Sequence, residues 1–395
     1  MRLGLYTDVI YRSDGETLST DRAFIRFVTS MPPRIEELVL FGRLDPKPGR
    51  SPYPLPREGV RFVPLPFYPS VFAVPGLARA VPESARIFKA ELDRLDAVWI
   101  FGPHPLALAF ARVARRHRTP LVLGVRQDYP QYIGNRLPGR AWLWAVPVAH
   151  GLEQAFRRLA RKTPTVVLGE ELARNYRSGN GRVFVTGLSL VRAAELVPVG
   201  EALAKRWDGD LRLLTVGRLD PEKNPLLLAD VIARLRDREP RWRLTVAGDG
   251  PVRPELERRI AELRLQDAVE LLGYVPNGPG LWERYRQSHA FLHVSLTEGL
   301  PQVLFEAQAA GLPIVATDVG GVRAALADGA AGALIRPRDA EGAAAALERL
   351  RTDEALRRRL IEAGLANASH ETMEAQLDRL DEFIRSVVAS ARSRD

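Results

Sequence analysis

Short apolar segments of strand length alternate with amphipathic helical segments along the chain, and this alternation starts again after residue 210. In the first half, apolar strand patterns occupy residues 2–11, 36–42, 60–66, 96–103, 120–128 and 163–171. In the second half, they occupy residues 211–220, 242–250, 268–276, 290–299, 313–321 and 332–339. Strands that are apolar on both faces and separated by helices are typical of parallel sheets covered on both sides. The sequence therefore predicts an α/β fold with two Rossmann-like, doubly wound domains.

The break between the domains is expected at residues 192–210, where the alternation lapses. A chain of 395 residues is also too long for one ordinary hydrophobic core. We predict a first domain at 1–195 and a second at 196–370, with a C-terminal helix in 371–395 that packs back towards the first. The domains should face a central cleft, with ligands beyond the carboxyl ends of the strands. Residues 43–85 are rich in proline, which predicts loop or edge structure in place of helix.

The positive charge of the chain is concentrated in its first half. The formal net charge is +9, and residues 1–200 hold 29 Lys and Arg against 17 Asp and Glu. This imbalance favours anionic partners such as phosphorylated substrates or an anionic membrane surface. No nucleic-acid motif accompanies the charge, so we expect no nucleic-acid partner.

Several classes of protein are disfavoured by composition. The chain has no cysteine, so it offers neither disulfides nor thiolate metal ligands. No apolar run reaches the roughly 20 residues of a membrane span. The N-terminus alternates like a strand and lacks the long apolar core of a signal peptide. A cytoplasmic protein is the simplest prediction.

Four segments of the second half place glycines and charged side chains directly after predicted strands. They are VGRLDPEKN at 216–224, AGDGP at 247–251, GYVP at 273–276 and TEGLPQVLFEA at 297–307. The carboxyl ends of parallel strands share one edge of a sheet, so these loops should lie together. Glycines let the backbone approach phosphate oxygens, and the start of a helix adds N–H groups and a positive dipole end. Together they predict a site for a nucleotide diphosphate.

Two cations and two acids give these loops their chemistry. Arg218 presents a planar fork of donors and Lys223 a point charge, and together they can offset a diphosphate. Glu298 and Glu306 lie eight positions apart. A carboxylate in the first helical turn can accept hydrogen bonds from ribose hydroxyls, which suits Glu306, whereas Glu298 would face a distal sugar. Taken alone, the acids are also typical of a loop and a solvated helix face, and the cations of rim salt bridges.

The segment HVSLTEGLPQVLFEAQAAGLPIVATDVGG at 293–321, with the three loops upstream, resembles the retaining glycosyltransferases of family four (glycosyl transferases group 1), which have the GT-B fold. The resemblance covers about 217–330 and includes the family's pattern of two glutamates separated by seven residues. It implies a hexosyltransferase-type enzyme that moves a sugar from a nucleotide-diphosphate sugar to an acceptor hydroxyl with retention. It also implies no metal and no other cofactor. The first domain would bind the acceptor, which is a glycan, a lipid or a small molecule, and the second the nucleotide sugar.

The resemblance also implies roles for individual residues. Arg218 and Lys223 would stabilise the leaving diphosphate, and Glu298 would contact the donor sugar; these three are the catalytic candidates. No carboxylate is poised as a nucleophile, so we expect attack on the same face, with the leaving phosphate accepting the acceptor's proton. The implied donor-binding residues are Gly15, Gly217, Gly248, Tyr274, Val275, Gly299, Leu300, Pro301, Gln302, Val303 and Glu306.

The first half follows the family only in its alternation. The family's Gly-Gly loop after the first strand is reduced to Gly15, and the histidine that usually ends the strand at 121–125 is replaced by Arg126. The acceptor-side candidates are His104, Arg126, Gln127 and Asp128. The alternatives are a His104 that caps the following helix and a structural Arg126–Asp128 pair. His293, on a buried strand, is interpreted as a core histidine.

Residues 134–162 combine Trp142, Trp144 and Phe156 with six basic residues. This pattern is typical of a membrane interface, or of a core helix with a solvated basic face. A peripheral contact with anionic membranes is therefore a further expectation. Two alternative functions remain at this point: a nucleotide-sugar epimerase of the same fold, and a non-catalytic scaffold that binds sugar nucleotides.

Overall fold

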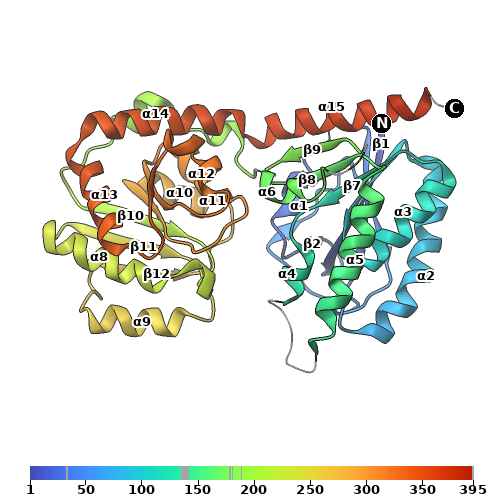
Figure 1. Cartoon of the computed structure of the whole chain (residues 1–395), viewed down its shortest axis with the longest axis horizontal. Helices are drawn as coiled ribbons and strands as arrows, with labels where there is room; N and C mark the ends of the chain where they lie inside the picture. The colour runs from blue at the N-terminus through green and yellow to red at the C-terminus, as the bar shows by residue number, and fades with distance from the viewer. Residues whose placement is uncertain (33, 135–141, 178, 180, 188, 394–395) are drawn as a thin grey trace. The chain divides into compact units, whose positions relative to one another are not determined.

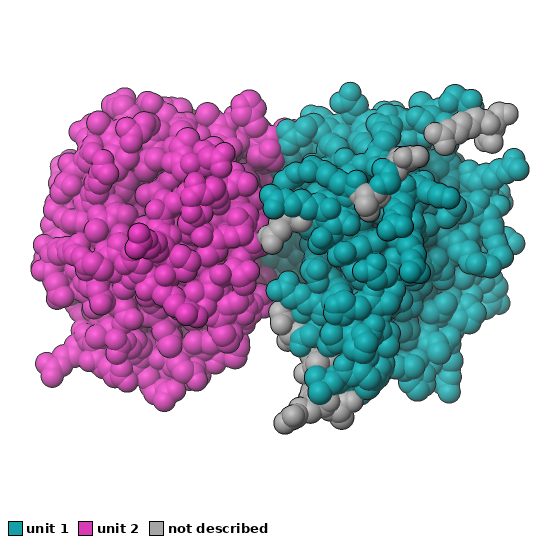
Figure 2. All heavy atoms as spheres, in the orientation of Figure 1, with its two compact units in different colours: residues 1–188, 376–395 teal, residues 189–375 magenta. Residues whose placement is uncertain are grey.

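The structure is a computed structural model that describes residues 1–393 except 33, 135–141, 178, 180 and 188. Its contacts divide the chain into two compact units, Met1–Leu188 with Gln376–Asp395, and Ser189–Ala375. Figure 1 follows the chain through its helices and strands, and Figure 2 colours the two units separately. Among the described residues, no helix has the length and apolar character needed to cross a membrane.

The first unit is built on a mainly parallel sheet. Its parallel strands lie in the order β5-β3-β1-β6-β7-β8-β9, while β2 and β4 form an antiparallel extension beside the end of β1. Strand order reverses between β1 and β6, so a ligand crevice is expected beyond the carboxyl ends of these two strands. The strands are β1 (Arg2–Ser13), β2 (Leu18–Thr20), β3 (Glu37–Leu44), β4 (Tyr53–Pro54), β5 (Val60–Leu65), β6 (Ala97–Gly102), β7 (Leu121–Val125), β8 (Thr165–Leu168) and β9 (Val183–Thr186).

Helices cover this sheet and bury its aromatic side chains. Phe41 from β3 packs edge-on against Phe88 of α2, and Phe88 stacks on Phe110 of α3. The helices of this unit are α1 (Phe24–Val28), α2 (Val74–Glu91), α3 (Pro105–His117), α4 (Tyr129–Gly134), α5 (Ala145–Ala160), α6 (Glu170–Arg174) and, apart from its first residues, α15 (Met373–Arg392).

The proline-rich segment 43–85 departs from expectation, because α2 begins inside it at Val74. Pro75 falls in the first turn, where a helix does not need the missing N–H. Pro82 lies within the helix and removes one backbone hydrogen bond. The buried face formed by Ala80, Ser84 and Phe88 keeps the segment helical. Local proline content was therefore a poor guide where tertiary packing fixes the helix.

The second unit has the strand order β12-β11-β10-β13-β14-β15, and neighbouring strands pair in parallel. This is the doubly wound order, and it confirms the predicted Rossmann-like architecture. The order reverses between β10 and β13. The strands are β10 (Leu211–Val216), β11 (Trp242–Ala247), β12 (Val269–Gly273), β13 (Ala290–His293), β14 (Ile314–Thr317) and β15 (Ala333–Ile335). The helices are α7 (Val199–Leu203), α8 (Leu226–Arg238), α9 (Arg253–Glu262), α10 (Pro279–Gln287), α11 (Gln302–Ala309), α12 (Val322–Ala325), α13 (Ala340–Thr352) and α14 (Glu354–His370).

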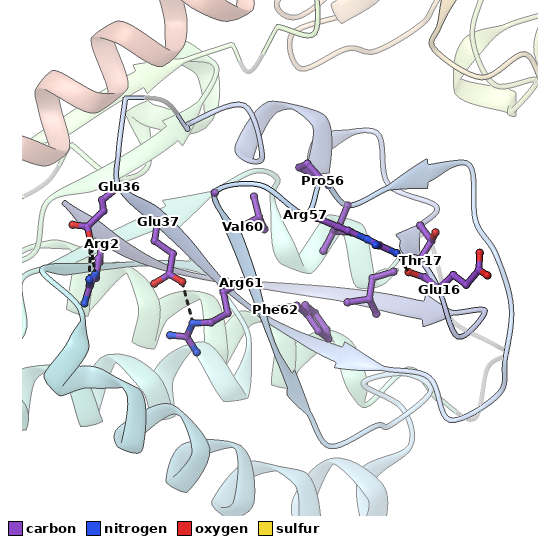
Figure 3. Close-up of a pocket in the computed structure, with 13 residues that line it drawn as sticks. Arg2, Glu16, Thr17, Glu36, Glu37, Pro56, Arg57, Val60, Arg61 and Phe62 are labelled. Atoms are coloured by element: carbon purple, nitrogen blue, oxygen red, sulfur yellow. Dashed lines mark hydrogen bonds and ion pairs between the residues drawn. The ribbon is translucent and has the colours of Figure 1, made fainter.

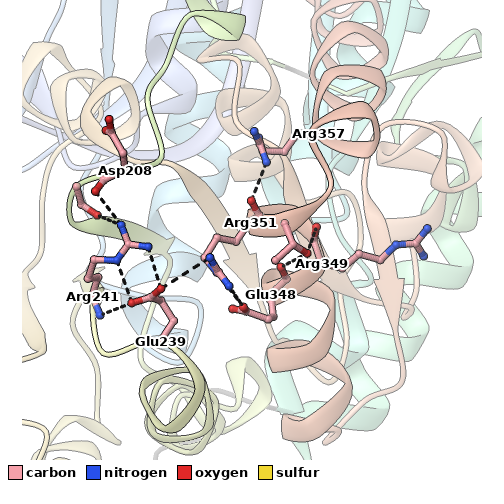
Figure 4. Close-up of polar contacts among 9 residues, drawn as sticks. Asp208, Glu239, Arg241, Glu348, Arg349, Arg351 and Arg357 are labelled. Atoms are coloured by element: carbon pink, nitrogen blue, oxygen red, sulfur yellow. Dashed lines mark hydrogen bonds and ion pairs between the residues drawn. The ribbon is translucent and has the colours of Figure 1, made fainter.

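A chain of ion pairs links the turn before β11 to the end of α13 (Figure 4). Arg241 pairs with Glu239 at 2.8 Å, and Glu239 lies 3.7 Å from Arg351, which also pairs with Glu348. Hydrogen bonds from Arg241 are the main reason that the pKa of Glu239 is lowered to about 2. The Glu239 and Arg351 side chains are 16% and 26% exposed, and ion pairs close to the surface contribute little each. We interpret the chain of ion pairs as a structural feature of the surface.

Candidate functional site

A pocket of about 300 Å³ opens in the second unit where its strand order reverses. Its walls come from the ends of β10 and β13, from the loop that carries Arg218 and Lys223, and from the first residues of α11. The fold rule for doubly wound sheets places ligands at this position. The sheet thus brings together two of the four predicted loops, residues 216–224 and 297–307, at one pocket.

Lys223, Glu298 and His293 form the charged centre of this pocket. Lys223 Nζ donates a hydrogen bond of 2.6 Å to Glu298 Oε1, and His293 Nε2 lies 2.9 Å from the same oxygen. The side chains of Glu298 and His293 are only 9% and 6% exposed. Burial opposes ionisation of Glu298, but the contacts with His293 and Lys223 outweigh it and lower its pKa to about 2. The buried carboxylate is therefore charged at neutral pH and holds the ammonium group in place.

The interpretation of His293 as a core histidine captured only its burial. The histidine ends β13, and its side chain is turned to the pocket and to Glu298. Its position five residues before Glu298, at the end of an apolar strand, was the available sequence signal. Burial alone could not reveal that the ring faces a carboxylate.

Arg218 also lines the pocket, but it is held differently from Lys223. Its side chain is 65% exposed and pairs with Asp220 and, at 3.2 Å, with Glu222. Both acids stand in the same short loop and were not singled out from the sequence. An anion that binds Arg218 must therefore compete with these carboxylates, whereas Lys223 is already fixed beside Glu298.

The N-terminus of α11 forms the opposite wall of the pocket. Leu300, Pro301, Gln302 and Val303 line it, and Pro301 occupies the N-cap without a side-chain cap. The first N–H groups of a helix have no partner within the helix, so this wall presents donors and the positive dipole end. Gly299 joins this wall to Glu298. A Cβ on the neighbouring Gly321 would collide with the carbonyl oxygen of Gly299, which explains why a glycine supports the turn.

Different surroundings explain the glycines at positions 217 and 248. A Cβ on Gly248 would collide with the carbonyl oxygen of Gly217, so the close approach of two backbone loops requires the glycine. A Cβ on Gly217 would meet no heavy atom within 4 Å, although Gly217 lines the pocket. Packing therefore explains Gly248, whereas the open space at Gly217 remains available to a ligand.

These two glycines give a matched pair of variants. Gly248→Ala should lower the free energy of unfolding by about 1–3 kcal/mol, because the new methyl group overpacks the loop. Gly217→Ala should leave it nearly unchanged, since nothing lies within 4 Å of the added Cβ. Thermal denaturation of both variants, without ligand, measures the difference. Equal stability of the two would show that the backbone contact between the loops is not tight.

Glu306 is buried, which contradicts the alternative that it belongs to a solvated helix face. It is 5% exposed, and its oxygens accept hydrogen bonds of 2.8 Å from the Asn277 amide and from the Tyr285 hydroxyl. Tyr285 is on α10, whose buried residues Leu281, Trp282 and Tyr285 follow helical spacing, and this spacing was the available sequence signal for Tyr285. A ribose that reaches Glu306 would have to share or displace these donors.

The remaining residues of the predicted donor set lie at different depths. Tyr274 is 60% exposed, and Val275 packs on the apolar core of the second unit. Gly15 belongs to the first unit, in the turn between β1 and β2, with a positive φ of 97°. Its N–H bonds to the Ser13 hydroxyl, and a Cβ there would meet nothing within 4 Å. The local turn accounts for this glycine.

In the first unit, His104 does cap a helix, and it also joins a buried polar cluster. Its Nδ1 accepts a hydrogen bond from the Leu106 N–H at 3.2 Å, as the alternative interpretation expected. The other ring nitrogen lies 3.3 Å from the Tyr68 hydroxyl and 3.5 Å from Asp8. Tyr68 donates a hydrogen bond of 2.8 Å to Asp8, which also pairs with Arg43 at 3.0 Å. Sequence reasoning missed Asp8, Tyr68 and Arg43.

Burial and the neighbouring opposite charges act in opposite directions on the pKa values of Asp8 and His104. Burial raises the pKa of Asp8, but the neighbouring His104, Arg43 and Tyr68 hydroxyl outweigh it and hold the pKa below its usual value. Burial lowers the pKa of His104, although Asp8 opposes this. The cluster therefore keeps an ionised Asp8 at neutral pH. It lies at the reversal between β1 and β6, the position in this unit that corresponds to the pocket of the second unit.

The other acceptor-side candidates have separate roles. Arg126 lies over the rings of Phe24 and Phe101, 4.5 and 5.2 Å from their centroids. Asp128 caps α4 by accepting a hydrogen bond of 2.9 Å from the Gln131 N–H, and Gln127 is exposed. Asp128 is thus explained by helix capping, whereas His104 and Arg126 lie near Asp8 and interact with its charge.

A wider hollow of about 780 Å³ lies elsewhere in the first unit, beside β5 (Figure 3). Its arginines are paired: Arg2 pairs with Glu36 at 2.7 Å, Arg61 with Glu37 at 3.2 Å, and Arg57 donates to the Glu16 carbonyl. It is bordered by Arg2 at the start of β1 and by Leu18, which pairs with Ser13 at the end of β1, and none of its lining residues belongs to β6. Despite its size, it is a weaker candidate than the two crevices at the reversals of strand order.

Within the described part of the chain, no group of three or more His, Cys, Asp or Glu side chains is arranged to hold a metal ion. The cationic partner of Glu298 is Lys223, and the pocket offers cations and helix N–H groups to an anion. The donor set of the pocket therefore suits an anionic ligand.

Two parallel, doubly wound sheets in one chain, each with a crevice at its reversal of strand order, define a protein of the GT-B class. The chain is similar to a sucrose-phosphate synthase from Thermosynechococcus elongatus, with a TM-score of 0.69, 18% identity, and coverage of 99% of this chain and 100% of that one. It is also similar to HepE from Anabaena, solved in complex with UDP, with a TM-score of 0.67, 17% identity, and coverage of 98% and 99%. At this identity, the likeness shows the fold.

Sequence comparison gives a family match for part of the chain. Residues 204–366 match the family described as glycosyl transferases group 1. A D-inositol 3-phosphate glycosyltransferase from Stackebrandtia nassauensis is 36% identical over 251 residues, which cover 58% of this chain and 56% of the relative. The chain spans about half the length of the curated relatives it matches. The resemblance predicted from residues 217–330 is confirmed.

Proposed function

We propose that this protein is a glycosyltransferase that moves a sugar from a nucleotide-diphosphate sugar to an acceptor hydroxyl. The observation that carries the proposal is the pocket between β10 and β13, where Lys223, paired with the buried Glu298, faces the N-terminus of α11. Donors of both kinds, a point charge and backbone N–H groups, suit the diphosphate that leaves during transfer. The matching family and the glycosyltransferase relatives support the same activity.

The proposed reaction retains the configuration of the anomeric carbon and uses no metal. The bond from that carbon to the diphosphate oxygen breaks first, and the acceptor oxygen attacks from the same face. The acceptor's proton passes to the departing phosphate. Lys223 and the helix N-terminus stabilise the charge that develops on the leaving group, with Arg218 as a second cation. Glu298 orients Lys223 and accepts hydrogen bonds from the sugar, and Glu306 receives the ribose.

Nucleotide binding is tested by thermal shift with UDP, GDP, ADP and their sugar conjugates. A ligand at 100 times its Kd stabilises the folded state by about 2.7 kcal/mol, which raises the melting temperature measurably. Gly217→Ala should weaken the binding of the active nucleotide roughly tenfold, or about 1.4 kcal/mol, without lowering the melting temperature of the unliganded protein. No shift with any nucleotide, or an equal shift in wild type and Gly217→Ala, would contradict the assignment of this pocket.

Turnover separates the proposed activity from its alternatives. With donor and acceptor present, NMR of the product should show retained anomeric configuration, and EDTA should not lower the rate. Incubation of donor alone should give slow hydrolysis at most. Interconversion of the donor sugar would identify an epimerase instead, and nucleotide binding without turnover on any acceptor would identify a scaffold. An inverted product would overturn the retaining mechanism.

A further inference from the structure

A second pocket, of about 290 Å³, lies in the first unit at the reversal between β1 and β6. Asp8 and Arg43 from the buried polar cluster line it, and so do Arg12 and Arg22. Arg43 is 4% exposed, lies 4.1 Å above the centre of the Tyr68 ring, and donates to the Tyr68 carbonyl oxygen. Its buried Nε has no hydrogen-bond partner in the described structure. One end of this pocket is thus polar, and Arg43 is held there by Asp8 and by the Tyr68 carbonyl oxygen.

The other wall of the pocket is apolar. Val71 and Phe72, which precede α2, line it together with Tyr129, Tyr132 and Ile133 of α4. Tyr129 and Ile133 pack on Ala145 and Ala149 of α5, so α4 and α5 lie side by side. The pocket is therefore two-sided in chemistry, with arginines at one side and aliphatic and aromatic groups at the other.

The apolar wall continues onto an exposed surface. Phe72 packs edge-on against Trp142, with ring centres 5.2 Å apart, and Trp142 lies 5.5 Å from Trp144. Beside these rings, Leu143 is 57% exposed, Trp144 47%, Val148 51% and Val74 46%. These four residues, called here the apolar rim, include most of the large hydrophobic side chains that the described structure exposes. Exposed apolar patches of this kind mark interaction sites.

We propose that the acceptor is a membrane lipid with an anionic head group, which enters this second pocket while the apolar rim inserts into the membrane interface. The proposal rests on the proposed glycosyltransferase function and names the class of its acceptor. Indole and aliphatic side chains beside a basic surface favour the interface of an anionic bilayer. Arg12 and Arg22, whose side chains are 52% and 49% exposed, give the head group cationic donors in exchange for their pairs with Asp45 and Asp21. The ionised Asp8 can accept a hydrogen bond from the hydroxyl of the head group.

The sequence pattern at 134–162 anticipated a membrane contact on different grounds. It counted basic residues that include Arg136 and Arg140, which lie outside the described residues. The structure adds the connection from Trp142 through Phe72 to the polar pocket. Residues 71–74, residues 142–149 and α4 therefore connect the apolar rim to the polar pocket.

Cosedimentation of the full chain with vesicles tests the apolar rim. Wild type should bind vesicles of phosphatidylcholine with phosphatidylglycerol, and at least tenfold more weakly those of phosphatidylcholine alone. Trp144→Ser with Val148→Ser should lower the affinity for the mixed vesicles at least tenfold. Val199→Ser is the matched control, because Val199 is 43% exposed in the other unit, and it should bind like wild type. Equal binding by the double variant and the control would overturn the proposal.

Removing one positive charge tests the proposed head-group site. Arg22 is half exposed, so Arg22→Gln should fold normally and lose much of the preference for phosphatidylglycerol. Arg57→Gln, which removes a charge from the wider hollow instead, should keep it. Glycerol 3-phosphate serves as the soluble source of the same anion. A thermal shift with glycerol 3-phosphate and no binding to vesicles would identify a soluble acceptor and overturn the lipid assignment.

Nucleotide binding distinguishes a failure of the lipid-acceptor proposal from a failure of the proposed glycosyltransferase function. If the rim variants lose vesicle binding but keep the nucleotide-induced thermal shift, the second pocket and the donor pocket act as separate sites, as proposed. Absence of vesicle binding by wild type, with the nucleotide shift intact, would overturn the lipid acceptor alone. Absence of the nucleotide shift would overturn the proposed function whatever the vesicles show.

Discussion

Replacing Lys223 with alanine should lower the turnover of sugar transfer roughly 10²–10³-fold, the usual effect of removing one donor that stabilises a developing negative charge. The expectation follows from its position. The Lys223 side chain is 23% exposed and lines the same pocket as the start of α11, and its ammonium lies 2.6 Å from the buried Glu298. The measurement is kcat at saturating donor and acceptor. Near-normal turnover would show that the leaving group does not depend on this cation.

Two control variants separate catalysis from folding. Lys223→Arg keeps the positive charge and should recover part of the activity. Lys205→Ala removes the other lysine of the second unit, whose Nζ donates to the Ser288 and Arg286 carbonyls and whose pKa is lowered to about 8, chiefly by burial. This control should lower the melting temperature and leave kcat close to wild type below that temperature. An equal loss of kcat in Lys205→Ala would attribute the effect to destabilisation.

The second large effect is expected for stability at acid pH. Burial opposes the charge on Glu298, yet His293 and Lys223 lower its pKa from 4.5 to about 2. A carboxyl group with a lower pKa in the folded state stabilises the protein above the unfolded value of 4.5. This contribution is lost as pH falls from about 4.5 towards 2, and a shift of this size corresponds to at most about 3 kcal/mol.

Glu298→Gln should therefore be less stable than wild type at pH 7 by up to about 3 kcal/mol, and the difference should shrink as pH falls towards 2. Urea denaturation at a series of pH values measures it. Glu257→Gln is the matched control, because Glu257 is half exposed and pairs with Arg253 on one helix face. Its effect should stay within about 0.5 kcal/mol at every pH. A constant difference for Glu298→Gln across the range would mean that its carboxyl is not ionised by its neighbours.

The proposed donor pocket was more accessible to prediction from sequence than the proposed acceptor pocket. Lys223 and Glu298 were predicted from loops that follow strands, and the fold brings those loops to one pocket because the carboxyl ends of parallel strands share an edge. The partners of these residues were not predicted. Asp220 and Glu222 compete for Arg218, and Tyr285 and Asn277 occupy Glu306, through contacts that no spacing in the sequence specifies.

The proposed acceptor pocket depends on contacts between distant parts of the chain. Asp8, Arg43, Tyr68 and His104 come from β1, β3, the segment after β5 and the start of α3. Only His104 was singled out beforehand, because a polar residue after an apolar strand is visible locally. The others are unremarkable in their own segments, and they meet only because the sheet aligns β1 with β3 and β6.

The amino-acid sequence by itself determined the two doubly wound sheets and the loops that line the proposed donor pocket, because burial of parallel strands imposes a periodicity that each segment shows locally. The tertiary structure alone decided which charges meet. It paired Lys223 with Glu298, turned His293 from a core position into a neighbour of that carboxylate, and gathered Asp8 and Arg43 beside an apolar wall. The physical reason is that ion pairs and pockets depend on the register and packing of strands far apart in the chain.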